Sequence, residues 1–298
     1  ATKFCNTCIK LVESNLGPSE LVAALLYNSS MIYVEANEFA FAEEKISECM
    51  KIRTQTSGQE NILYVRSLCL MGDILSTMSE YATSQACFDK AIGILKIIPP
   101  RYHLDFGNVL YKLGRNQHRR GGYLDDAFQC YEEALEFEKV VLGSSHSFIA
   151  SLLTKKGEIL LENDDVEQAI QNFNDALKVL NDALAAAGDD STSSYLRSKV
   201  LILEGLLLSV SAESNKCIVK YKQGLKLLKK FVPNKKIKMA ELTYLVGSEF
   251  EKQGDYKAAD KVYNERIELV KEVLGPTHLD IAETLVNLSG VKSALGDD

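Results

Sequence analysis

The chain has 298 residues, a formal net charge of −7 at pH 7 and an isoelectric point near 5.3. This acidic balance argues against general nucleic-acid binding, which requires a basic surface to neutralise phosphates. The sequence has no signal-peptide pattern, and no apolar run approaches the roughly 18 residues of a transmembrane helix, so we expect a cytoplasmic protein without a membrane span.

A pattern of small and apolar residues recurs along the whole chain. In its best-formed copy, Ala127, Tyr131 and Ala134 follow a turn at Gly121 and Gly122. Offsets of four and three place such residues on one helical face, where two small residues beside a ring let a neighbouring helix approach closely. The copies begin 41, 42, 43, 42, 48 and 42 residues apart: Ala1/Cys5/Cys8, Ala42/Ile46/Cys49, Ser84/Phe88/Ala91, Ala127/Tyr131/Ala134, Ala169/Phe173/Ala176, Cys217/Tyr221/Gly224 and Ala259/Tyr263/Arg266.

A second series, of glycine or serine, lies upstream of each turn. A glycine inside a helix costs about 1 kcal/mol relative to alanine, so its recurrence at one repeat position needs a reason. We expect each member to mark the place where the first helix of a unit crosses close to the second helix. The series is Ser30, Gly72, Gly114, Gly157, Gly205, Gly247 and Ser289.

These two series predict consecutive helix pairs and an all-α fold. In chain order we expect helices at 1–17, 19–36, 38–54, 60–77, 80–97, 104–119, 123–142, 146–162, 165–187, 193–210, 213–231, 235–252, 255–274 and 278–294. All five prolines fall between the units, as expected because helices exclude interior proline. The division is the second helix of a truncated repeat at 1–17, six full repeats at 18–58, 59–100, 101–143, 144–188, 189–232 and 233–275, and a further first helix at 276–298.

The unit resembles the tetratricopeptide repeat, whose Leu-Gly, small-residue and aromatic signature is present as Leu113-Gly114, Ala127, Tyr131 and Ala134. The unit of about 42 residues, together with the junctions 142–146 and 274–282, is similar to the repeats of kinesin light chain. The resemblance implies one right-handed superhelical solenoid over residues 1–298, with a peptide-binding concave face lined by the first helices. It also implies an acidic cargo peptide or a free C-terminal carboxylate as ligand, and a motor or other large complex as partner.

Counting from the glycine or serine series gives candidate peptide-binding residues on the first helices. Repeat three contributes a cationic group at Arg115, His118 and Arg119, and arginine pairs well with carboxylates. The same cations at a helix end could instead serve only the helix dipole, so both interpretations stay open. The candidates are Arg66, Asn108, Tyr111, Arg115, His118, Arg119, Lys199 and Tyr244.

Other chemistry-bearing residues favour structural roles. The seven cysteines follow the repeat, and Cys5-x-x-Cys8 has no second pair or suitably spaced histidine, so we expect packing and neither a metal nor a cofactor. The histidines His103, His146 and His278 begin first helices, where we expect junction packing or capping. No catalytic arrangement stands out. A lysine run from Lys220 to Lys238 is interpreted as a solvated outer face, with binding of an acidic partner as the alternative.

The sequence therefore favours a non-catalytic adaptor that binds a short, acidic segment of another protein. Two alternatives remain: a structural scaffold or self-associating spacer in a larger complex, and a regulatory arm of an enzyme whose catalytic part lies elsewhere. Because the chain begins inside a second helix and ends after a first helix, we expect it to be a piece of a longer protein.

Overall fold

The computed structural model describes residues 2–98, 103–187 and 191–296 of the chain. Within these ranges all regular structure is helical, as the sequence predicts. The helices are α1 (Thr2–Leu16), α2 (Glu20–Glu35), α3 (Phe39–Thr56), α4 (Ile62–Thr77), α5 (Tyr81–Leu95), α6 (His103–Arg120), α7 (Leu124–Leu142), α8 (Ser147–Glu162), α9 (Val166–Ala186), α10 (Ser191–Val210), α11 (Ser214–Phe231), α12 (Lys236–Lys252), α13 (Tyr256–Leu274) and α14 (Leu279–Leu295).

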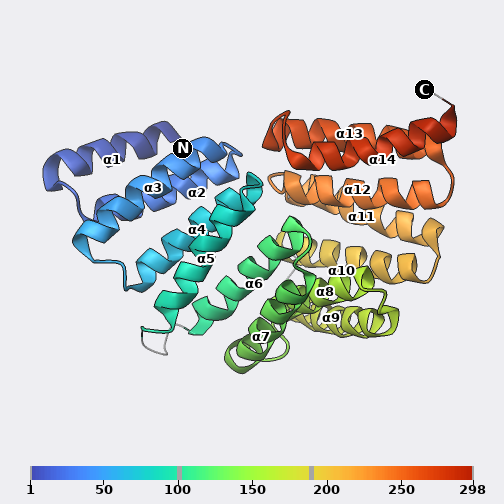
Figure 1. Ribbon diagram of the computed structural model, residues 1–298, viewed down its shortest axis with the longest axis horizontal. Coiled ribbons are helices and arrows are strands. Elements are labelled where there is room, and N and C mark those ends of the chain that lie inside the picture. The colour runs from blue at the N-terminus through green and yellow to red at the C-terminus, as the bar shows by residue number, and fades with distance from the viewer. Residues whose placement is uncertain (1, 99–102, 188–190, 297–298) are drawn as a thin grey trace. The chain divides into compact units, whose positions relative to one another are not determined.

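The chain forms two compact units, each built from consecutive helix pairs (Figure 1). Unit 1, Ala1–Val141, holds α1 to α7, and unit 2, Leu142–Asp298, holds α8 to α14. Helices α2 and α3, and then α4 and α5, are the main pairs of unit 1, and α8 with α9, α10 with α11 and α12 with α13 are those of unit 2. The single solenoid and its division into repeats remain predictions for the chain as a whole.

The turns inside the pairs lie where the sequence places them, and their backbone explains why. Asn37, Ser79, Asp164 and Ala212 adopt left-handed conformations, with φ of 59°, 65°, 60° and 58°. The next residue then donates its N–H to the fifth carbonyl before it, as from Glu38 N to Tyr33 O at 2.9 Å. This Schellman motif satisfies carbonyls that a helix end would otherwise leave unpaired.

The recurring triads form the core of both units. From the second copy to the last, all three members are buried, including Arg266. The first triad is only partly described: Ala1 and the Cys5 side chain lie outside the described residues, and Cys8 is half-buried. Within each compact unit, second helices also contact the first helix of the following repeat, as α3 contacts α4 and α11 contacts α12, so the core continues from pair to pair there.

The glycine series packs against the large residue of each triad, as expected. A Cβ atom at Gly205 would lie 2.3 Å from the Tyr221 ring, and one at Gly157 would lie 2.5 Å from Phe173. Two serines add hydrogen bonds across their helix pairs. Ser30, a member of the series, donates from its hydroxyl to Ala42 O at 2.8 Å, and the triad residue Ser84 donates to Gly72 O at 2.8 Å. The missing side chain is therefore what lets the helices of a pair cross at close range.

Candidate functional site

The first helices of unit 1 place their polar side chains on a common surface. Helix α4 contacts both α2 and α6, so the three first helices lie side by side. We call this surface the unit 1 face; its residues are Tyr27, Arg66, Asp73, Asp105, Asn108, Tyr111, Lys112, Arg115, His118 and Arg119.

Two arginines of the unit 1 face are paired with carboxylates of the neighbouring first helix. Arg66 of α4 makes a two-point contact with Asp105 of α6, at 3.2 Å from Nε and 3.3 Å from Nη2. In the other direction, Arg115 Nη2 lies 2.8 Å from Asp73 Oδ1, and Lys112 also donates to Asp73. The predicted cations are thus brought together on α4 and α6, but internal carboxylates already contact two of them.

The remaining candidates of unit 1 all belong to α6. Asn108 is exposed, and the Tyr111 ring packs on Tyr131 with centroids 5.8 Å apart. His118 and Arg119 are half-buried in the last turn, where cations also suit the helix dipole. Helix α6 therefore carries five of the eight predicted residues.

The two candidates of unit 2 have different surroundings. Lys199 of α10 donates from Nζ to Ser151 Oγ of α8 at 3.1 Å and lies 5.3 Å from the Tyr195 ring centroid. Burial, reinforced by the positive charge of Lys238, lowers the pKa of the Lys199 ammonium to about 8. Tyr244 of α12 accepts a hydrogen bond from Asn287 of α14 at 3.0 Å. The two residues lie on neighbouring first helices of one unit, α10 and α12.

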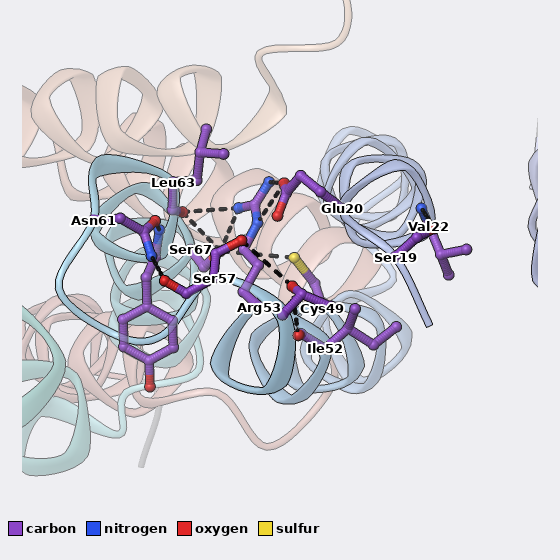
Figure 2. A network of polar contacts seen from close by, with 12 residues as sticks. Ser19, Glu20, Val22, Cys49, Ile52, Arg53, Ser57, Asn61, Leu63 and Ser67 are labelled. Carbon is purple, nitrogen blue, oxygen red and sulfur yellow. Dashed lines mark hydrogen bonds and ion pairs between the residues drawn. The ribbon is translucent and has the colours of Figure 1, made fainter. Parts of the chain in front are cut away.

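In each unit, a buried arginine of a second helix contacts side chains of the neighbouring first helices. In unit 1, Arg53 of α3 contacts Glu20 at 2.9 Å, Leu63 O at 2.8 Å and Ser67 Oγ at 2.7 Å (Figure 2). The guanidinium also lies 5.5 Å from the Tyr27 ring centroid. These contacts join α3 to the first helices on both sides of it, α2 and α4.

Arg266 of α13 has a similar role in unit 2 from a different repeat position: it lies seven residues after Ala259, whereas Arg53 lies eleven residues after Ala42. Its Nη atoms contact Thr284 at 2.7 Å and Glu283 at 3.0 Å, both on α14, and its guanidinium lies 4.1 Å from the Tyr244 ring centroid. Tyr27 and Tyr244 occupy the same repeat position, three residues before the glycine or serine, so a buried guanidinium supports a tyrosine of the first-helix face in both units.

Sequence reasoning missed several charged neighbours of the candidates, notably Asp105, Lys112 and Lys238. The repeat register could have found them. Asp105 and Lys238 each lie nine residues before the glycine of their own helix, and each follows a candidate cation, Arg66 or Lys199, by 39 residues. Positions 39 residues apart, three short of a 42-residue repeat, can therefore be neighbours on successive first helices, as Arg66 and Asp105 are.

The lysine run divides between two helices. Lys222, Lys226, Lys229 and Lys230 are exposed on α11, and Lys229 pairs with Glu265 of α13 at 3.1 Å. Lys236 and Lys238 instead belong to α12, a first helix. The outer-face interpretation therefore fits the α11 part of the run. Lys238 lies on a first helix, as Lys199 does, and its charge acts on Lys199.

Two of the three histidines cap helices as expected. His146 Nδ1 accepts from Phe148 N at 3.3 Å, and His278 Nδ1 accepts from Asp280 N at 3.1 Å. The side chain of His103 lies outside the described residues. Cys49, Cys69 and Cys217 are buried free thiols, and burial raises the pKa of Cys69 to about 12. These cysteines pack as small apolar residues.

Two negative findings apply to the described ranges alone. No helix there combines the length and the apolar character that crossing a bilayer requires. Nor do those ranges contain a group of three or more His, Cys, Asp or Glu side chains placed to hold a metal ion.

Comparison with known proteins identifies the repeat. A family model described as tetratricopeptide repeat matches residues 105–182, and a second with the same description matches residues 65–94. No curated protein matches the sequence.

Several solved structures share the fold. The apo form of RapI is 18% identical with a TM-score of 0.71, over 90% of each chain. The Rap conjugation gene regulator of plasmid pLS20, in complex with the Phr* peptide, is 16% identical with a TM-score of 0.65, over 99% of this chain and 70% of that one. A Rap protein complexed with competence and sporulation factor is 12% identical with a TM-score of 0.60, over 100% of this chain and 82% of that one. At such identities the likeness shows the fold alone.

Proposed function

Because this chain is a tetratricopeptide-repeat protein, we propose that it is a non-catalytic, cytoplasmic adaptor whose first-helix faces capture a short, acidic segment of a partner protein. The observation that carries the proposal is the concentration of polar side chains and cations on the surface of α4 and α6, next to a buried apolar core. The peptides named with two of the similar Rap structures support capture of a peptide.

The acidic preference rests on the cations of the unit 1 face. Arg66, Lys112 and Arg115 gather around the carboxylates of Asp73 and Asp105. These contacts lie at a partly exposed surface, where an ion pair contributes about 1 kcal/mol or less and is readily exchanged. An incoming carboxylate therefore replaces an internal one at little cost, and the arginine fork provides the two-point geometry that binds it.

The eight predicted residues then have separate roles within their own units. In unit 1, Arg66, Arg115 and Arg119 supply charge, while Asn108, Tyr111 and His118 supply hydrogen bonds and ring contact. In unit 2, Lys199 supplies charge, and Tyr244 supplies hydrogen bonding and ring contact. A partner that is a motor or another large complex, as the likeness to kinesin light chain implies, is part of this proposal.

A peptide-array screen of the purified chain tests the function. We expect acidic peptides to bind, and the double change of Arg115→Glu and Arg119→Glu to weaken them by about tenfold or more, because charge repulsion replaces charge-assisted hydrogen bonds. The matched control is Arg120→Glu, since Arg120 is exposed, lies over the Tyr123 ring at 4.5 Å and donates to Gln85 of α5. Equal binding by the double variant and the native chain would show that the unit 1 face is not the site.

A further inference from the structure

Helix α11 of unit 2 concentrates positive charge within an acidic chain. It contains neither Asp nor Glu, although the net charge of the whole chain is −7. Its lysines are Lys216, Lys220, Lys222, Lys226, Lys229 and Lys230. The last four are exposed and follow one another at offsets of four, three and one residues. These four lysines, which we call the α11 lysine strip, therefore lie along one side of the helix over about 12 Å.

The strip faces away from the core of unit 2. Cys217, Tyr221 and Leu228 form the buried side of α11, and the lysines lie on the opposite side. Together with Leu225, they line an open hollow of about 420 Å³. Val219, one turn before the strip begins, is exposed as well. The surface thus combines a row of ammonium groups with apolar contact area.

Neither the fold nor the helix dipole explains the strip. The same repeat positions hold Asn174, Lys178, Asn181 and Asp182 on α9, and Asn264, Glu268, Lys271 and Glu272 on α13. The dipole favours cations in the last helical turn, where Lys229 and Lys230 lie, but not at Lys222 and Lys226. Like charges four residues apart destabilise a helix, and the strip contains two such pairs. A surface that lowers local stability without a structural role points to binding.

Contacts within unit 2 neutralise only part of this charge. Lys229 pairs with Glu265 of α13 at 3.1 Å. No acid among the described residues contacts the ammonium groups of the other three lysines. Lys222 instead lies over the Phe250 ring, 4.6 Å from its centroid, and Lys230 lies over the ring of the phenylalanine that follows it, at 4.8 Å. Such ring contacts hold an ammonium in place and leave its charge uncompensated.

The width of the strip favours a narrow partner. The neighbouring helix α13 carries exposed carboxylates at Glu265, Glu268 and Glu272, which a broad anionic membrane surface would also meet. A nucleic acid stacks its bases on aromatic rings, and the ring of Phe250 already has Lys222 over it. A single helix matches better, because residues on any α-helix rise by about 1.5 Å each. Carboxylates at the same offsets as the lysines therefore form a complementary row.

We propose that the α11 lysine strip docks an amphipathic helix of a partner protein whose carboxylates form a row on one face. Leucines beside that row contact Leu225 and Val219. Because α11 is a second helix, this surface is separate from the first-helix faces of the proposed function and adds a further binding site.

Three end-capped, alanine-based helical peptides with a fluorescent label test the docking site. The first carries four glutamates at offsets of four, three and one residues, with leucines beside them. The second has the same composition with its glutamates spread around the helix, and the third has glutamine in place of glutamate. We expect the chain to bind the first about fivefold more tightly than the second, and not to bind the third. Equal binding of the first two would overturn the proposed row of ion pairs.

A double variant of the strip tests where the first peptide binds. Lys222→Gln with Lys226→Gln should weaken it by about tenfold, because two exposed ion pairs are lost. The matched control, Lys257→Gln with Lys261→Gln, removes two exposed lysines at the same spacing from α13. In the native chain, the peptide should also protect the first pair of lysines from acetylation and leave the second pair reactive, as measured by mass spectrometry. Equal effects at the two pairs would overturn the site.

Other occupants are distinguished in parallel. The probes are vesicles of phosphatidylcholine with phosphatidylserine, a single-stranded oligonucleotide, and a concentration series of the chain alone. If one of these interactions depends on Lys222 and Lys226 while the first peptide does not bind, the helix-docking proposal is wrong.

The Arg115→Glu and Arg119→Glu double variant separates the strip from the proposed function. It should leave the acetylation protection of the strip unchanged. If this variant loses all binding of the first peptide and the strip is never protected, the peptide binds the unit 1 face, which overturns the strip and leaves the adaptor function standing. Protection of the strip, together with array peptides that ignore the arginine changes, would reject the unit 1 site and retain the strip.

Discussion

The two units share one packing scheme but differ in how they treat charge. In both, a glycine of the first helix receives the large residue of the triad, and a buried arginine lies over a tyrosine of the first-helix face. On the surface, unit 1 neutralises its cations with Asp73 and Asp105, whereas unit 2 places Lys238 beside Lys199. The packing is thus repeated while the exposed positions change, which is how a repeat fold keeps its stability and acquires binding specificity.

The buried arginines provide the largest expected effect on this comparison. Arg53→Met and Arg266→Met should each lower the free energy of unfolding by about 3 kcal/mol, because each leaves polar groups of the adjacent first helix without their partner. Chemical denaturation followed by circular dichroism measures the loss. If the free energy of unfolding changes by less than about 0.5 kcal/mol in one variant alone, the two arginines do not stabilise their units to the same extent.

The glycine positions give the next largest effect, and its sign depends on what each glycine contacts. Gly205→Ala and Gly72→Ala should destabilise by roughly 1–3 kcal/mol, because the new Cβ would lie 2.3 Å from Tyr221 and 2.7 Å from Phe88. The controls are Gly93→Ala and Gly290→Ala, at helix positions where a Cβ meets no atom within 4 Å. These should stabilise by about 0.5–1 kcal/mol through helix propensity. Thermal unfolding of the four variants checks the opposite signs; destabilisation by all four would contradict the close-crossing account.

A core position of unit 1 should show a pH-dependent effect that unit 2 lacks. Glu138 is 2% exposed, eleven residues after Ala127, where unit 2 has Leu180, Leu228 and Val270. Burial, with a smaller contribution from Asp105, raises the pKa of the Glu138 carboxyl from 4.5 to about 7. The folded state therefore holds this proton more tightly than the unfolded state, so stability declines as the pH rises from about 4.5 to about 7 and then levels off.

Replacing this carboxyl removes the decline. Glu138→Gln should raise the free energy of unfolding by about 1–2 kcal/mol at pH 8 and by very little at pH 4. Denaturant titrations at the two pH values measure the difference. Glu136→Gln, on the exposed side of the same helix, serves as the control and should show no such pH dependence. An equal gain at both pH values would point to packing rather than to ionisation.

The smallest effect should come from making the charge of unit 1 more like that of unit 2. Asp73→Asn removes the carboxylate shared by Lys112 and Arg115, so an acidic peptide should bind about threefold more tightly, with stability altered by less than about 1 kcal/mol. Fluorescence polarisation with an acidic peptide measures the gain. Asp125→Asn, at the exposed start of α7, should leave affinity unchanged; a gain of the same size there would indicate a general charge effect.

The sequence alone determined the helix pairs, their turns and their core. The spacing of the triads and of the glycines reports contacts inside one pair, and those contacts repeat with the chain. Asn37, Ser79, Asp164 and Ala212, which lie in the gaps between the expected helices, all have the left-handed backbone that ends a helix.

Only the tertiary structure decided which charges meet. The sequence placed Arg66, Arg115 and Lys199 on first helices, but whether each has an acidic partner depends on a residue about one repeat away. Asp105 and Asp73 reach the two arginines, whereas Lys199 is close to Ser151 and subject to the charge of Lys238. Side-chain reach between neighbouring first helices sets these pairings, and a periodic pattern specifies the backbone that carries the side chains rather than where their charged ends lie.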